Sequence, residues 1–255
     1  MDQTAEYRVR DVEGVDPVVA VLTSTSMAQI DGAQPQNARR DVRNITMKVG
    51  LKPDYSMHTV QSLRSSLYEY LLPKAMVQLG FYLDGVLFAI TSGQVESVDN
   101  VLFSQDPEVD TSILCYDPDF YAPTPEVFST HTQSDNLTTS LIEYAGTSDA
   151  GFIFALNVNR TLTSFSVANT TLDGLKQKLE VIGSFIPGDI VTVNTIPGSK
   201  AVTLTRAGIT TSVLYYKTSV STWPILKKGD NLLGVYSSGA GIPYTVTYTP
   251  KFGGL

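Results

Sequence analysis

Residues 188–217, GDIVTVNTIPGSKAVTLTRAGITTSVLYYK, show the strand pattern of this chain most clearly. Residues 189–195, 201–205 and 212–217 are short segments rich in Val, Thr and Tyr, which favour β-strands. Turn-forming residues stand between these segments, at Pro197–Lys200 and Arg206–Gly208. The stretch therefore predicts three short strands joined by turns.

Similar segments fill the rest of the second half. Strands are predicted at 151–158, 165–169, 232–238 and 244–250. Residues 172–183 fit either a helix or a strand, and we favour a strand. About eight short strands at this spacing, without helices, predict an antiparallel β-sandwich.

The first half adds one helix to a mainly β pattern. A helix is predicted over 59–72, because apolar residues recur there at helical spacing and a proline follows as a stop signal. The residues of this apolar face are Val60, Leu63, Leu67, Tyr70 and Leu71. Residues 75–90 predict a hairpin that turns at Asp84–Gly85, a dipeptide that adopts positive φ easily. Further strands are predicted at 93–98 and 108–115. Residues 121–136 have the proline-containing, polar composition of a linker, so two domains are expected, 1–130 and 131–255.

The charge balance argues against two classes of partner. The chain has 255 residues, with 18 basic and 25 acidic side chains and a formal net charge of −7. Nucleic acid and anionic membranes repel such a protein, so binding by bulk attraction is not expected. No apolar run approaches the roughly 18 residues of a membrane helix, and the polar N-terminal stretch predicts no signal peptide. We therefore expect a protein made in a cytoplasm and not inserted in a membrane.

One short region gathers acids around the only cysteine. Residues 103–123 hold Asp106, Glu108, Asp110, Asp117, Asp119 and Cys115. Paired carboxylates can serve a glycosidase or a calcium site, but Asp-Pro turns are common solvated turns and the EF-hand pattern is missing. Alternation places Cys115 on the same face as Val109 and Ile113, so we interpret it as a core cysteine.

Other catalytic templates are incomplete. His58 and His131 are the only histidines, and no GxSxG motif accompanies them. The glycine-rich run 237–242 lacks the lysine and the helix of a phosphate loop. Trp223, the only tryptophan, could stack a sugar ring or cap the sandwich core. We therefore expect a binding or assembly protein that is not an enzyme and needs no metal or cofactor.

Three stretches, read in order, resemble the distal tail protein family of long-tailed (siphovirus-type) bacteriophages. They are 39–47 (RRDVRNITM), 103–120 (FSQDPEVDTSILCYDPDF) and 188–238, which ends in PILKKGDNLLGVYSS. The resemblance implies a mainly β chain, with a ring-forming split β-barrel and one helix in 1–130 and a galectin-like β-sandwich in 131–255.

The resemblance also implies a structural role in the virion, assembled in the host cytoplasm. Its members form a hub ring, commonly of six copies, that joins the tail tube protein to tail-associated hub or fibre proteins. Edge strands near 93–98 are expected to pair across subunits. The alternative function is a carbohydrate-binding module that contacts a host-surface glycan, with Trp223 as the candidate sugar or partner contact. The galectin sugar motif is not retained there, because Pro224 follows Trp223.

Overall fold

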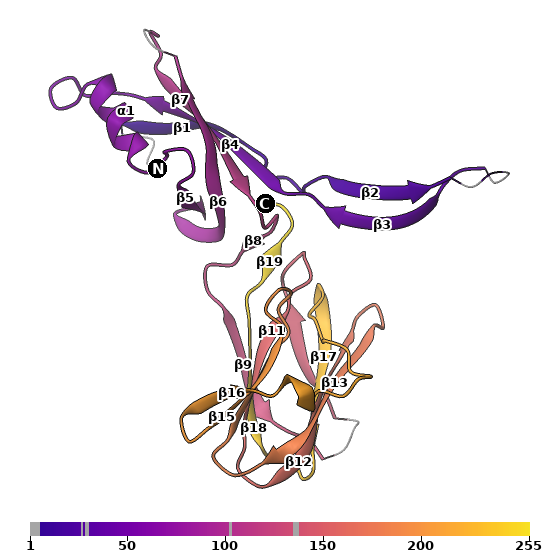
Figure 1. Cartoon of the computed structure of the whole chain (residues 1–255). Coiled ribbons are helices and arrows are strands. Elements are labelled where there is room, and N and C mark those ends of the chain that lie inside the picture. Colours follow the sequence, from indigo (N-terminus) through magenta and orange to yellow (C-terminus); the bar gives the residue numbers. More distant parts are fainter. Residues whose placement is uncertain (1–5, 27, 29–30, 102–103, 135–137) are drawn as a thin grey trace. The chain divides into compact units, whose positions relative to one another are not determined.

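The computed structural model describes residues 6–26, 28, 31–101, 104–134 and 138–255. The chain divides into two compact units (Figure 1), unit 1 with residues 1–123 and 253–255, and unit 2 with residues 124–252. Among the described residues, antiparallel strands dominate and α1 (Val60–Tyr68) is the single α-helix. This confirms the prediction of a mainly β protein. None of the described helices is long and apolar enough to cross a membrane.

Unit 1 is built on an antiparallel sheet with the strand order β1-β4-β7-β6-β8, in which β5 also pairs with β6. Its strands are β1 (Tyr7–Glu13), β4 (Arg43–Leu51), β5 (Met76–Leu83), β6 (Val86–Asn100), β7 (Glu108–Cys115) and β8 (Phe120–Tyr121). Strand β7 follows the predicted alternation. Ile45 and Val49 of β4 are the cross-strand partners of Ile113 and Val109, and all four side chains are fully buried. These pairs form the centre of the unit 1 core.

Helix α1 is shorter than the predicted span of 59–72. It begins with a capping box, in which Ser62 N donates to Thr59 Oγ1 (3.2 Å) and Thr59 N donates to Ser62 Oγ (2.9 Å). It ends at Tyr68, because the chain then tightens into a turn in which Tyr70 N donates to Leu67 O (3.2 Å), three residues back. The prediction that Tyr70 lies on the apolar face is wrong, since 71% of this residue is exposed.

The β5–β6 hairpin confirms the prediction for 75–90. It turns at Asp84 and Gly85, whose φ angles are 50° and 79°. The expected separate strand at 93–98 is wrong, because these residues continue β6 without a break. The expectation that this segment is an edge strand is also wrong at Gln94, because Gln94 pairs with β5 on one side and with β7 on the other.

Unit 1 also contains a two-stranded ribbon that the sequence did not predict. Strands β2 (Ala20–Thr25) and β3 (Gln34–Arg40) pair with each other and with no other described strand (Figure 1). Every residue of β3 is exposed, and in β2 only Val21 is half-buried. We call this pair of strands the arm. Its strands therefore contribute almost nothing to the core of unit 1.

Unit 2 is a sandwich of two antiparallel sheets. The four-stranded sheet has the order β10-β17-β12-β13 and the six-stranded sheet the order β16-β15-β14-β11-β18-β9. The strands are β9 (Glu126–His131), β10 (Ser140–Tyr144), β11 (Phe152–Asn157), β12 (Leu162–Thr171), β13 (Lys176–Phe185), β14 (Ile190–Asn194), β15 (Ala201–Arg206), β16 (Ile209–Ser212), β17 (Gly229–Ser237) and β18 (Pro243–Tyr248). The short β19 (Lys251–Phe252) ends the unit.

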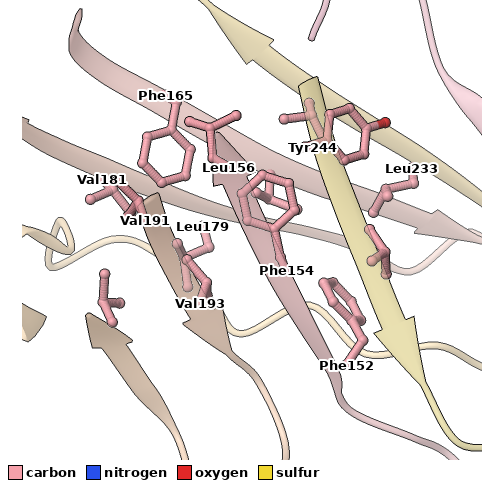
Figure 2. Close-up of a cluster of buried hydrophobic side chains, with 14 of the residues drawn as sticks. Phe152, Phe154, Leu156, Phe165, Leu179, Val181, Val191, Val193, Leu233 and Tyr244 are labelled. Carbon is pink, nitrogen blue, oxygen red and sulfur yellow. The ribbon is translucent and has the colours of Figure 1, made fainter. Parts of the chain in front are cut away.

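The two sheets of unit 2 enclose an aromatic and aliphatic core. Figure 2 shows Phe154 of the six-stranded sheet and Phe165 of the four-stranded sheet, whose rings stack with centroids 5.9 Å apart. Phe154 also packs against Tyr244 at 5.4 Å. These side chains are fully buried or nearly so, and aromatic pairs at such distances add to the hydrophobic stabilisation.

Three local expectations for the second half have different outcomes. Residues 172–183 were expected to form a strand, and β13 confirms this after a turn at Gly174. Residues 212–217 were expected to be a strand, which is wrong, because β16 ends at Ser212 and Leu214–Tyr216 form a short 3-10 helix. Residues 121–136 were expected to be a linker, but strand β9 occupies 126–131, so the division between the units falls after Pro123.

Candidate assembly surface of unit 1

Cys115 lies in the core of unit 1, as predicted. It is fully buried at the end of β7. Gly93 of the neighbouring strand leaves room for it, because a Cβ atom on Gly93 would lie only 2.7 Å from the Cys115 sulfur. Burial raises the pKa of the thiol, which disfavours the reactive thiolate. Cys115 therefore contributes packing and has no features of a nucleophile.

The acids around Cys115 separate into two groups. At one end of β7, Asp106 and Glu108 both form ion pairs with Arg10, and the hydrogen bond from Arg10 lowers the pKa of Asp106. At the other end, Asp117 and Asp119 lie in the turn before β8, and the fifth acid, Asp110, is exposed within β7. Within the described part of the chain, no cluster of three or more potential metal-ligating side chains exists. The five carboxylates therefore form no common site.

Asp119 anchors the arm. Its side chain is almost completely buried and forms a two-pronged ion pair with Arg40, the last residue of β3, with Nη2 2.9 Å from Oδ2. The turn before it is held by Asp117, which accepts hydrogen bonds from Asp119 N (3.1 Å) and from the Tyr121 hydroxyl. Burial and the contact with Asp117 raise the pKa of Tyr121. The Asp-Pro-Asp turn therefore has a structural role.

Arg43 lies next to this anchor and is 1% exposed. Its guanidinium donates four hydrogen bonds to backbone carbonyls: Gly14 (2.5 Å), Asp16 (2.7 Å), Pro118 (2.8 Å) and Gly253 (2.6 Å). It also lies 4.2 Å from the centre of the Phe120 ring, a cation–π distance. Burial lowers the Arg43 pKa, yet an arginine stays charged at neutral pH.

Arg40, Arg43, Asp117, Asp119 and Phe120 form what we call the arm root. The ribbon is closed at its base by the hydrogen bond from Asp41 N to Val19 O (3.1 Å). Gly14 follows β1 with a φ of 82°, and a Cβ there would clash with the Asn44 carbonyl, so only glycine fits. The arm root fixes the base of an arm whose own strands are exposed.

The arm has the properties of a docking element. An isolated two-stranded ribbon is at best marginally stable in water, and its outer edges carry unpaired backbone donors and acceptors. Strands β2 and β3 have the sequences AVLTST and QPQNARR, which contain no acidic residue in a chain with 25 acids. The only charged side chains of the two strands are therefore Arg39 and Arg40, which favour an approach by an acidic or neutral surface.

The remaining candidate residues do not form a catalytic site. His58 precedes α1 in unit 1, where its Nε2 lies 4.0 Å from Glu6 Oε1, and His131 ends β9 in unit 2. The glycine-rich run 237–242 joins β17 to β18, and Arg160 donates to the Ala240 carbonyl there (2.7 Å). This run is therefore a loop between two strands and is not followed by a helix.

Trp223 is half-buried and packs against the core of unit 2. Two lysines lie close to its ring, with Lys200 Nζ 5.8 Å and Lys217 Nζ 6.0 Å from the ring centre. Lys217 is held in place by hydrogen bonds to the carbonyls of Thr218 (3.0 Å) and Ser221 (3.1 Å). These contacts favour a packing role for Trp223 over a sugar-stacking role, since stacking requires an open ring face.

We expect Trp223→Ala to lower the free energy of unfolding of unit 2 by roughly 2 kcal/mol, less than the loss of a fully buried aromatic side chain. Chemical denaturation followed by circular dichroism measures this. Val220→Ala is the matched control, because Val220 is 85% exposed in the same unit, and its effect should be within about 0.5 kcal/mol. Glycan binding that disappears in Trp223→Ala while stability is unchanged would restore the sugar-stacking interpretation.

Comparison with known proteins connects this fold to phage tails. Residues 145–252 match the model of the siphovirus-type tail component, C-terminal domain. No curated protein sequence matches the chain. The solved structure of the Dit (gp 19.1) protein of phage SPP1, a hub of the adsorption apparatus in phages that infect Gram-positive bacteria, covers 99% of this chain and 96% of its own, with 16% identity and a TM-score of 0.69.

Two baseplate structures of phage p2 in the activated conformation match more weakly. The one with calcium has 9% identity and a TM-score of 0.44, and the one with strontium has 10% identity and a TM-score of 0.46. Each covers 96% of this chain and 91% of the matched chain. The resemblance to the distal tail protein family is confirmed: residues 145–252 match the C-terminal domain of siphovirus-type tail components, and the whole chain shares the fold of the SPP1 Dit protein.

Proposed function

We propose that this chain forms a closed hub ring of identical copies at the distal end of the tail tube and has no catalytic turnover. Six copies is the number that the family resemblance implies. The ring would join the tube protein on one side to tail-associated hub or fibre proteins on the other. The observation that carries this proposal is the arm, a paired ribbon without a core of its own.

A ring of identical subunits needs two different, complementary surfaces on each subunit. The arm supplies one of them. Strands β1 and β5 supply candidates for the other, because each pairs with a neighbour on one side only within the described sheet. An arm strand that pairs with such an edge would satisfy backbone groups on both chains, as in other cases of strand addition.

The test is a measurement of particle mass and shape. We expect the purified chain, at high concentration, to give closed rings in negative-stain images and a mass by light scattering close to six times the chain mass of 27.7 kDa. A monodisperse species of a single chain mass over the same concentration range would contradict the proposal. Rings with another copy number would support the proposed ring and change only the number of copies in it.

A further inference from the structure

We infer that a pocket beside α1 in unit 1 binds a carboxylate-bearing peptide segment of a partner protein. The pocket has a volume of about 620 Å³ and lies between α1 and four residues at and after the end of β6, namely Asn100, Val101, Ser104 and Pro107. This volume is within the range of protein pockets that bind ligands. None of the residues that line this pocket belongs to the arm, β1 or β5, so the inference does not rest on the proposed ring.

Arg64 of α1 is the reason to expect an anionic ligand. Its Nε atom is buried and has no hydrogen-bond partner, and Arg64 forms no ion pair with any described residue. A buried N–H group without a partner destabilises the folded chain, and a ligand that accepts a hydrogen bond from this group removes that penalty. The nearby acids Asp106 and Glu108 do not supply that partner, because both are paired with Arg10.

The pocket walls favour a peptide with apolar residues around its acid. Val60, Val101 and Pro107 provide apolar surface. Tyr68 provides a second donor, because its hydroxyl oxygen accepts a hydrogen bond from Asn100 Nδ2 (2.5 Å) and its own hydrogen remains available. A guanidinium and a hydroxyl in one recess suit the two oxygens of a carboxylate.

Charge on the neighbouring surface supports the same class of ligand. A second cavity, of about 330 Å³, shares Pro107 with the first, and its charged lining residues are three basic ones, Arg8, Arg10 and Lys52, and one acid, Asp106, which pairs with Arg10. Of these three, only Arg10 forms an ion pair with a described residue. Basic side chains therefore gather here on a chain whose net charge is −7, which attracts an acidic partner.

The test uses a fluorescent peptide of alternating glutamate and leucine, and the same peptide with glutamine in place of glutamate. Binding to the full chain is followed by fluorescence anisotropy. We expect the glutamate peptide to bind more tightly, and Arg64→Gln to weaken it by roughly tenfold or more, the effect of one charge-assisted hydrogen bond. Lys176→Gln, which removes the same charge from an exposed position in unit 2, should leave the affinity unchanged.

Val101→Glu provides a second variant in case Arg64→Gln folds poorly, and thermal melting checks both. Val101 is 67% exposed and lines the pocket, so an acid there should repel the ligand without disturbing the core. Equal binding of the two peptides, or an unchanged affinity in both variants, would overturn the inference. A labelled DNA duplex whose binding is lost in Arg64→Gln, while the peptide does not bind, would assign the pocket to phosphate and also overturn it.

Discussion

Arg43→Met should destabilise unit 1 by about 3–5 kcal/mol, the cost of removing one partner from a buried charged network. The four carbonyls that Arg43 satisfies belong to three separate parts of the chain, residues 14–16, Pro118 and Gly253. Methionine fills the space but donates no hydrogen bond, so these carbonyls lose their partner. A domain has only about 5–15 kcal/mol of stability, so unit 1 should lose a large share of its stability and melt at a much lower temperature.

Differential scanning calorimetry can separate the two units, since each has its own core. In the Arg43→Met variant, the transition of unit 1 should move far down in temperature or disappear, while that of unit 2 stays in place. Arg39→Met is the matched control, because Arg39 is a nearby arginine on the exposed β3 strand. Similar melting curves for the two variants would show that the buried hydrogen bonds of Arg43 contribute little to the stability of unit 1.

Removal of the arm should abolish assembly and leave the fold intact. In the proposed variant, a short glycine-serine turn replaces residues 21–38, so that Arg40 keeps its ion pair with Asp119. The replaced strands are almost entirely exposed, so the melting temperature of the single chain should change little. Ring formation should be lost, because the arm is the surface that would reach the neighbouring copy.

Light scattering and negative-stain images of the arm variant provide the measurement. A milder variant, Leu22→Asp, adds an acid at an arm residue that is 73% exposed and should weaken assembly without affecting folding. Val220→Asp is the control, because it makes the same change at an exposed position of unit 2. Normal rings from the arm-deleted chain would show that the subunits meet through another surface.

Local sequence patterns predicted the strands that alternate and the turns that need special residues. Strand β7 and the turn at Asp84–Gly85 are examples, because each follows from the residues within it. The arm was missed because β3, QPQNARR, has no apolar alternation, and its extended form depends on pairing with β2. The segment at 93–98 was misassigned because a continuous strand of 15 residues changes its pairing partners along its length.

The sequence by itself determined the mainly β class, the sandwich of unit 2 and the burial of Cys115, because residue alternation and turn chemistry act over a few positions. Only the tertiary structure decided the roles of Arg43 and Asp119. Arg43 reaches a carbonyl 210 residues away, and Asp119 pairs with an arginine 79 residues before it. The partner of a charged side chain is a property of the folded chain, so spacing along the sequence could not reveal it.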